Sequence, residues 1–160
     1  MSGIAHASDE VFYQKEEVCG KCPKAFDPGP VTSEKDLCTT NTPYKYPVGE
    51  VTVKIQGNTV TGRFEFWSYR LFGEDVHHLY CQGFRSISGD FSGILKGDTA
   101  VVRYQHSWNE AGDTDSAEIR IGKESIQWRS VGLQHGYLGM IPSSMNLALR
   151  KKRVTHPIAP

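Results

Sequence analysis

The sequence has no net charge, and this absence argues against nucleic acid as its partner. Its 160 residues include 18 Lys and Arg and 18 Asp and Glu, so the formal charges cancel. Nucleic-acid-binding domains usually carry a clear basic excess. The chain also has no apolar run near the ~20 residues that a membrane-spanning helix needs. We therefore expect no nucleic-acid partner and no membrane span.

Sequence motifs of common enzyme classes are missing too. We find no GxxxxGK[ST] phosphate loop, no GxSxG nucleophile turn and no HExxH zinc helix. No segment suggests a parallel βαβ unit, which excludes a doubly wound nucleotide-binding fold. The sequence therefore predicts neither a cofactor nor a metal, and we do not expect an enzyme.

Helical periodicity is absent, because no segment repeats its apolar residues every 3.6 positions over three turns. From Glu50 onward the repeat is two residues, which is typical of strands with one buried face. Turn signals such as Gly57-Asn58, Gly89-Asp90 and Gly97-Asp98 interrupt it at intervals of about 8–12 residues. The strands that this pattern predicts are 11–18, 51–56, 60–69, 76–81, 84–88, 91–95, 99–107, 116–121, 125–129 and 145–149.

This pattern indicates an all-β antiparallel meander within one domain, closed as a β-barrel, with a β-sandwich as the alternative. Closure removes the unpaired sheet edges that would otherwise recruit other chains. The domain is predicted to span residues 10–150, with a long Pro- and Gly-rich loop over 20–49 that contains one short helical turn at 33–37. Flexible termini are expected at 1–9 and at the basic segment 151–160.

The four cysteines are an even number, as two disulfide bonds require. A bond between Cys19 and Cys22 would close a very small, strained ring. We expect Cys22–Cys38 to tie the long loop and Cys19–Cys81 to join two strands. One alternative is a redox centre at Cys19 and Cys22, which needs a helix that Pro23 disfavours. The other is a zinc site, which usually needs a second closely spaced cysteine pair.

Ala5-His6-Ala7 looks like the end of a signal-peptide cleavage site. A short disordered terminus is the alternative reading of the same residues. Together with the predicted disulfides, this segment favours a periplasmic or secreted protein.

Histidine and carboxylate side chains offer weaker candidates. His77 and His78 are adjacent in a predicted strand, so they point to opposite faces and cannot share one metal. We expect one buried histidine and several at the surface. The alternative is an enzyme in which one of the two acts with His106 and a carboxylate. Asp113 and Asp115 are predicted to be solvated in an exposed loop over 109–115, with a weak calcium site as the alternative.

Aromatic residues are the most informative feature. Strand alternation places Phe64 and Phe66 on one face, and Trp67 and Tyr69 on the other, so one of the two sets is a candidate for exposure. Exposed aromatics beside arginine are common anchors of protein interfaces. The residues predicted to contact a partner are Trp67, Tyr69, Arg70, Trp108, Glu110, Asp113, His135 and Tyr137.

The last 60 or so residues resemble a pattern in small bacterial exported β-domains. The stretches that carry the resemblance are Gly93–Val102, Ser116–Ile121, Ile126–Trp128, Tyr137–Pro142 and Leu147–Arg150. Domains of this kind include periplasmic inhibitors of lysozyme-type hydrolases and immunity proteins that neutralise cell-wall toxins. The Ser- and Gly-rich inhibitory loop typical of lysozyme inhibitors has no counterpart here, so no family residue is transferred.

These observations lead to one functional hypothesis and one alternative. The chain is predicted to be an exported monomer or homodimer that binds another protein, a hydrolase or a toxin, by inserting a loop into its cleft. The alternative is a β-barrel that binds a small ligand or a carbohydrate inside an aromatic-lined pocket.

Overall fold

The computed structural model describes residues 10–18, 45–72, 80–107, 112–132 and 141–151, and for 17–18, 45–46, 69–72 and 80–85 it describes the backbone alone. All regular structure in this part of the chain is β, which confirms the predicted class. The strands are β1 (Val11–Val18), β2 (Lys45–Gln56), β3 (Thr59–Phe72), β4 (Tyr80–Lys96), β5 (Thr99–His106), β6 (Asp115–Ile121), β7 (Ser125–Val131) and β8 (Ser144–Leu149).

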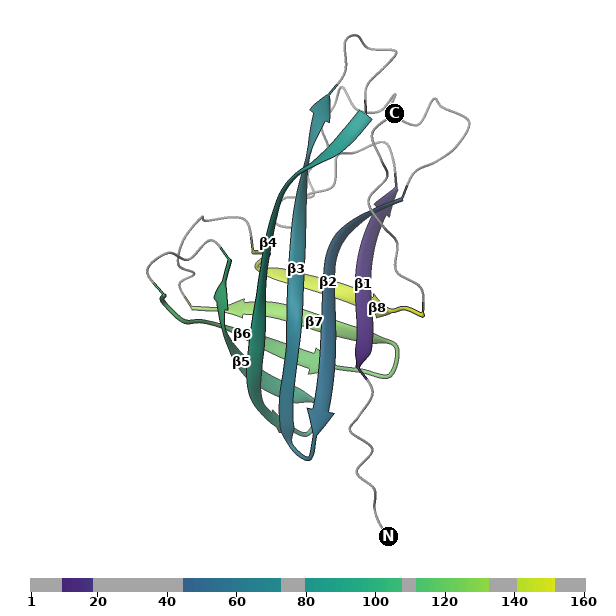
Figure 1. Cartoon of the computed structure of the whole chain (residues 1–160). Helices are drawn as coiled ribbons and strands as arrows, with labels where there is room; N and C mark the ends of the chain where they lie inside the picture. The colour runs from purple at the N-terminus through teal and green to yellow at the C-terminus, as the bar shows by residue number, and fades with distance from the viewer. Residues whose placement is uncertain (1–9, 19–44, 73–79, 108–111, 133–140, 152–160) are drawn as a thin grey trace.

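The eight strands form a closed antiparallel barrel, so the barrel is confirmed over the sandwich. Each strand pairs with the next along the chain, and β1 pairs with β8 to close the ring. The closing pairs are Tyr13 with Leu149 and Gln14 with Ala148, and the Arg150 amide donates to the Phe12 carbonyl at 3.0 Å. Figure 1 shows β1–β4 standing upright in front, with neighbouring strands in opposite directions, while β5–β8 cross behind them at a steep angle.

Two hairpin turns lie where the sequence predicts them. Gly57-Asn58 joins β2 to β3, and Gly97-Asp98 joins β4 to β5. Gly57 has a φ of 61° and Gly97 a φ of 66°, which lie in the left-handed region that favours glycine. The predicted turn over 122–124 also joins its two expected strands, β6 and β7.

Aromatic side chains fill the middle of the barrel. Trp128, Phe64 and Phe66 are fully buried. The Trp128 ring lies 5.1 Å from that of Phe64, 5.2 Å from that of Phe66 and 5.5 Å from that of Tyr104, measured between centroids. These separations are typical of packed aromatic pairs. The rings come from β3, β5 and β7, so one aromatic cluster connects strands from different sides of the barrel.

The turn predicted at Gly89-Asp90 is wrong, because β4 continues through both residues. The predicted strands 84–88 and 91–95 and the end of the predicted strand 76–81 are therefore one strand, which leaves eight strands in place of the ten predicted. A Cβ on Gly89 would lie 2.7 Å from the Gln105 carbonyl oxygen and 2.9 Å from the Phe64 ring. Gly89 thus allows close packing within a strand. In the sequence, the same Gly-Asp pair looks like a turn signal.

Strand β2 begins at Lys45, five residues before the alternation starts at Glu50, and so takes up the end of the predicted 20–49 loop. Its register with β1 shifts between Lys15 and Glu16, beside Pro47. Such a bulge accommodates a proline, which has no amide hydrogen to donate. The predicted helical turn at 33–37 and both termini lie outside the described residues. So do Cys19, Cys22 and Cys38, while Cys81 is described by its backbone alone, and the disulfides stay predictions.

Among the described residues, no helix is long and apolar enough to cross a membrane.

Candidate functional site

The two ends of the barrel differ in the length of their connections. Because the strands alternate in direction, connections 57–58, 97–98 and 122–124 lie at one end, which we call the turn end. The opposite end, the loop end, carries the connections 19–44, 73–79, 107–114 and 132–143. Binding residues in proteins are often found on loops held by a rigid scaffold. The loop end is therefore the candidate functional site.

The topology assigns the predicted contact residues to strands and connections that lead to the loop end. Tyr69 and Arg70 belong to the last part of β3, which runs toward this end and for which the backbone alone is described. Trp108, Glu110 and Asp113 belong to the connection between β5 and β6. His135 and Tyr137 belong to the connection between β7 and β8. Of these seven residues only Asp113 has a described side chain, and it is exposed.

Trp67 is on the outer face of β3, as the alternation predicts, but it is only 9% exposed. It is absent from the core cluster that contains its neighbour Phe66. A side chain with this exposure offers little surface to a partner. Trp67 is therefore the one predicted contact residue whose described environment argues against direct contact in the free protein.

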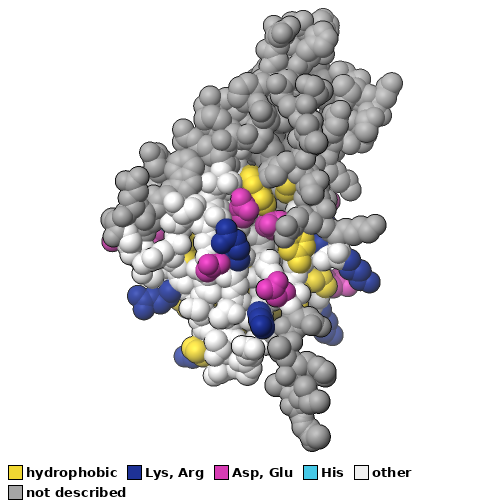
Figure 2. Space-filling view, in the orientation of Figure 1, with side chains coloured by type: hydrophobic (Ala, Val, Ile, Leu, Met, Phe, Trp, Pro, Cys, Tyr) yellow, Lys and Arg dark blue, Asp and Glu magenta, His cyan; other side chains and the backbone are white. Residues whose placement is uncertain are grey.

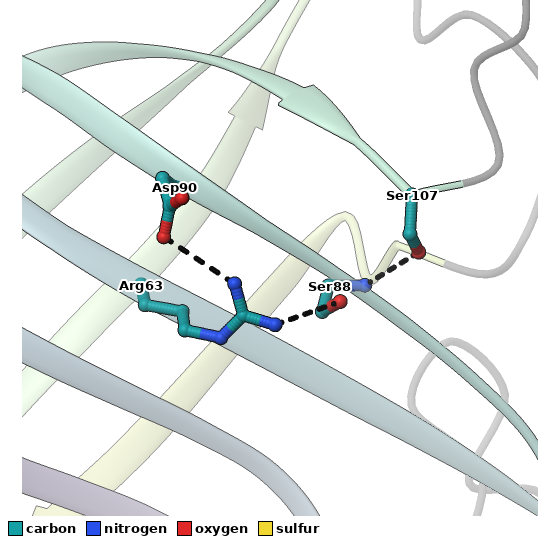
Figure 3. A network of polar contacts seen from close by, with 4 residues as sticks. All are labelled: Arg63, Ser88, Asp90 and Ser107. Atoms are coloured by element: carbon teal, nitrogen blue, oxygen red, sulfur yellow. Dashed lines mark hydrogen bonds and ion pairs between the residues drawn. The ribbon is translucent and has the colours of Figure 1, made fainter.

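Polar contacts hold the beginning of the connection between β5 and β6. The Ser107 amide donates to the Ser88 carbonyl at 2.7 Å, and the Ser88 amide donates to the Ser107 hydroxyl at 3.1 Å. On the same outer face, Arg63 contacts the Asp90 carboxylate and the Ser88 hydroxyl, both at 3.3 Å (Figure 3). This network joins β3, β4 and the first residue after β5.

The end of the same connection is held as well. The Gln105 side-chain amide donates to the Gly112 carbonyl at 2.6 Å. In the sequence, these two residues lie on either side of 108–111, which the structure does not describe. The described residues at both ends of this connection are thus held by hydrogen bonds.

The connection between β7 and β8 is tied down in a similar way. The Ser130 hydroxyl donates to the Pro142 carbonyl at 2.7 Å and accepts from the Trp128 indole at 3.4 Å. The Ser130 amide also donates to the Ser143 carbonyl at 2.9 Å. Because Trp128 lies in the aromatic cluster, these bonds link the connection directly to the core.

A buried polar group lies inside the barrel where β5 and β6 reach the loop end. Tyr104 pairs across the strands with Asp115, and the His106 Nε2 atom lies 3.6 Å from the Asp115 carboxylate. The His106 and Asp115 side chains are completely buried. Burial, followed by the negative charge of Asp115, raises the pKa of Tyr104 well above its usual range.

The prediction that Asp115 is a solvated loop carboxylate is wrong. Asp115 is 2% exposed because it is the first inward-facing residue of β6, followed by Ala117 and Ile119. The alternation of these three positions was a signal that could have placed it inside. His106 follows Val102 and Tyr104 on the inner face of β5, so it is a buried histidine of the predicted kind.

In the described structure, burial limits the proton transfers in which His106 and Asp115 can take part. A general acid or base must reach the proton it transfers, directly or through one water. Both side chains are closed off from solvent, and their contact lies between β5 and β6. His77 and His78 lie outside the described residues. In the described part of the chain, no three His, Cys, Asp or Glu side chains are grouped so that they could hold a metal ion.

No protein-family model, curated protein or solved structure matches this chain.

Proposed function

We propose that the chain is a protein-binding β-barrel whose contact surface is the loop end. The observation that carries the proposal is the contrast between a barrel centre filled with packed aromatic rings and one end that carries all the long connections. A filled centre leaves the binding to the surface. This argues against the alternative of a small ligand or a carbohydrate held in the middle of the barrel.

The anchored connections support a protein partner. Segments fixed at both ends by Ser107, Gln105 and Ser130 can enter a partner's cleft with a small loss of entropy. Trp108 and Tyr137 are large aromatic side chains of the kind that anchor protein interfaces. For the partner we propose a hydrolase or a toxin met in the periplasm or outside the cell, where the proposed disulfides Cys22–Cys38 and Cys19–Cys81 would persist.

Calorimetric titration of the whole chain against a panel of cell-wall hydrolases, lysozyme among them, tests this function. We expect saturable binding to at least one enzyme, accompanied by inhibition of its activity. The double variant Trp108→Ala/Tyr137→Ala should abolish the binding. Gln105→Ala/Ser107→Ala should weaken it by loosening one connection, whereas Gln127→Ala on the outer face of β7 should not change it.

The proposal fails if no hydrolase of the panel and no protein of a periplasmic extract binds saturably. It also fails if binding is found and the double variant at Trp108 and Tyr137 leaves it intact. Saturable binding of a free sugar or another small molecule would favour the alternative function instead.

A further inference from the structure

Two aliphatic side chains are exposed side by side on the outer face of β4 and β5, near the turn end. Ile94 is 50% exposed and Val101 is 54% exposed, and the two residues are direct partners across the strands. Single exposed aliphatic residues are common on protein surfaces. An adjacent pair is a larger apolar feature, and here polar side chains lie around it.

Basic side chains surround this pair. Lys96 follows Ile94 on the outer face of β4, Arg103 follows Val101 on that of β5, and Arg120 lies beyond them on β6. All three are exposed, and no carboxylate of the described residues forms an ion pair with them. Hydrophobic and basic side chains stand next to each other at the lower left of Figure 2, over this part of the barrel.

Two other arginines on the same outer face form ion pairs with carboxylates, and in this they differ from Lys96, Arg103 and Arg120. Arg63 contacts Asp90 at 3.3 Å, and Arg129 contacts Glu118 at 2.9 Å. The Glu118 carboxylate is thus already engaged beside Val101, its partner across β5 and β6. Asp98, in the turn next to Lys96, accepts from the Thr99 hydroxyl and adds one negative charge, so the three basic residues still leave the surroundings of the aliphatic pair positive overall.

We propose that the outer face around Ile94, Val101, Lys96, Arg103 and Arg120, which we call the basic face, binds an acidic protein segment that carries an apolar side chain. The carboxylates of such a segment would pair with the three basic residues. Its apolar side chain would cover Ile94 and Val101. Interfaces of this design combine an apolar centre with a charged rim, and complementary charge speeds the encounter of the two proteins.

Charge argues against the other occupants of this face. A second copy of the chain would bring two sets of Lys96, Arg103 and Arg120 close together, and like charges repel. Membrane-binding surfaces usually insert aromatic or long aliphatic side chains, whereas Ile94 and Val101 are short and lie on a flat sheet. Nucleic-acid surfaces for single strands usually add aromatic stacking platforms, and the basic face has none among its described residues.

The basic face is separate from the loop end, so this inference does not depend on the proposed function. Val101 lies five residues from His106, where β5 reaches the loop end. At about 3.4 Å per residue in an antiparallel strand, the separation along the strand is roughly 17 Å. Both surfaces could therefore be occupied at the same time.

Titration of the whole chain with two synthetic polymers, monitored by amide NMR shifts, tests the inference. The probes are poly(Glu), which is acidic only, and a random Glu/Tyr copolymer, which is acidic and apolar. We expect the copolymer to bind more tightly and to shift amides within 92–103 and 116–120. Ile94→Thr/Val101→Thr should weaken copolymer binding at least about tenfold, a loss expected of central contact residues, and leave poly(Glu) binding unchanged.

Arg103→Glu/Arg120→Glu should abolish binding of both polymers. Lys54→Glu/Lys151→Glu changes the net charge by the same amount elsewhere and should leave binding unchanged. Thermal unfolding of each variant shows whether it is folded. The inference is overturned by equal loss in both charge variants, by binding to phosphatidylcholine/phosphatidylglycerol vesicles without binding to the copolymer, or by self-association that Ile94→Thr/Val101→Thr removes.

Discussion

Asp115 and His106 are ionisable residues held entirely inside an apolar barrel, so each depends on the other. Burying a polar side chain without a partner costs free energy, because the protein interior solvates polar groups poorly. The 3.6 Å contact between the two side chains offsets part of that cost. The neighbouring Tyr104 hydroxyl shares the same environment, and its pKa is raised first by burial and then by the nearby Asp115 carboxylate.

Asp115→Asn keeps the shape of the side chain and removes its charge. We expect the free energy of unfolding to fall by about 1–3 kcal/mol, the usual cost of leaving a buried polar group without its partner. Urea denaturation measures the change. Asp113→Asn, on the exposed connection two residues earlier, is the control and should change stability by less than about 0.5 kcal/mol. Equal effects of the two substitutions would contradict the buried pair.

Tyr104 and Tyr13 predict how stability depends on alkaline pH. Burial raises the pKa of both phenols above the ordinary value of 10.0. In the unfolded chain the phenols ionise near pH 10, while the native state keeps them protonated. The unfolded state therefore binds fewer protons above pH 10, so stability is complete below that pH and falls as the pH rises.

Tyr104→Phe should remove most of this alkaline loss, because Tyr104 is the more deeply buried of the two phenols and faces Asp115. Unfolding measured between pH 8 and about 11.5 compares the slopes of the variant and the parent chain. The same slope in both would show that Tyr104 ionises as freely in the folded protein as in the unfolded one.

At the scale of elements, β4 shows why a turn signal was misleading. Gly89 allows the Phe64 ring and the Gln105 backbone to approach more closely than any Cβ would permit. The sequence displays the same Gly-Asp pair at positions 89–90 and 97–98. The difference between them lies in the tertiary packing, which a local pattern does not contain.

Gly89→Ala should lower the free energy of unfolding by about 1–3 kcal/mol, the usual cost of overpacking a core. The added methyl group meets a backbone oxygen at 2.7 Å, which cannot move without disturbing the pairing of β4 with β5. Ser92→Ala, at an exposed position of the same strand, is the matched control and should be nearly neutral. Thermal denaturation of both variants checks this, and a neutral Gly89→Ala would show that the strand bends away at this point.

Much of the element structure follows from the sequence. The two-residue repeat from Glu50 predicts β2, β3, β5, β7 and β8 because each strand buries one face. The repeat did not reveal the part of β2 from Lys45, since Pro47 and Gly49 interrupt it. Their places in the strand depend on the bulge in β2 opposite Lys15 and Glu16, and on the large residues nearby, including Phe66.

For the whole molecule, closure of the barrel follows from the number and spacing of turn signals, and the structure confirms it. The candidate site was harder to predict. Topology directs β3 and the two connections that carry the predicted contact residues toward one end, and the role of these residues in binding stays a prediction. Burial of Trp67 on the outer face required the three-dimensional structure, because its exposure depends on residues distant in sequence. The inner position of Asp115, in contrast, was signalled by its alternation with Ala117 and Ile119.

The central claim is that a filled barrel presents its loop end to a protein partner. Hydrogen–deuterium exchange of the whole chain, free and saturated with the hydrolase found by titration, tests it most directly. We predict slower exchange on binding in 107–114 and 132–143, with the turns at 57–58 and 97–98 unchanged. Protection confined to the turn end, with the exchange of the loop-end connections unaltered, would contradict the claim.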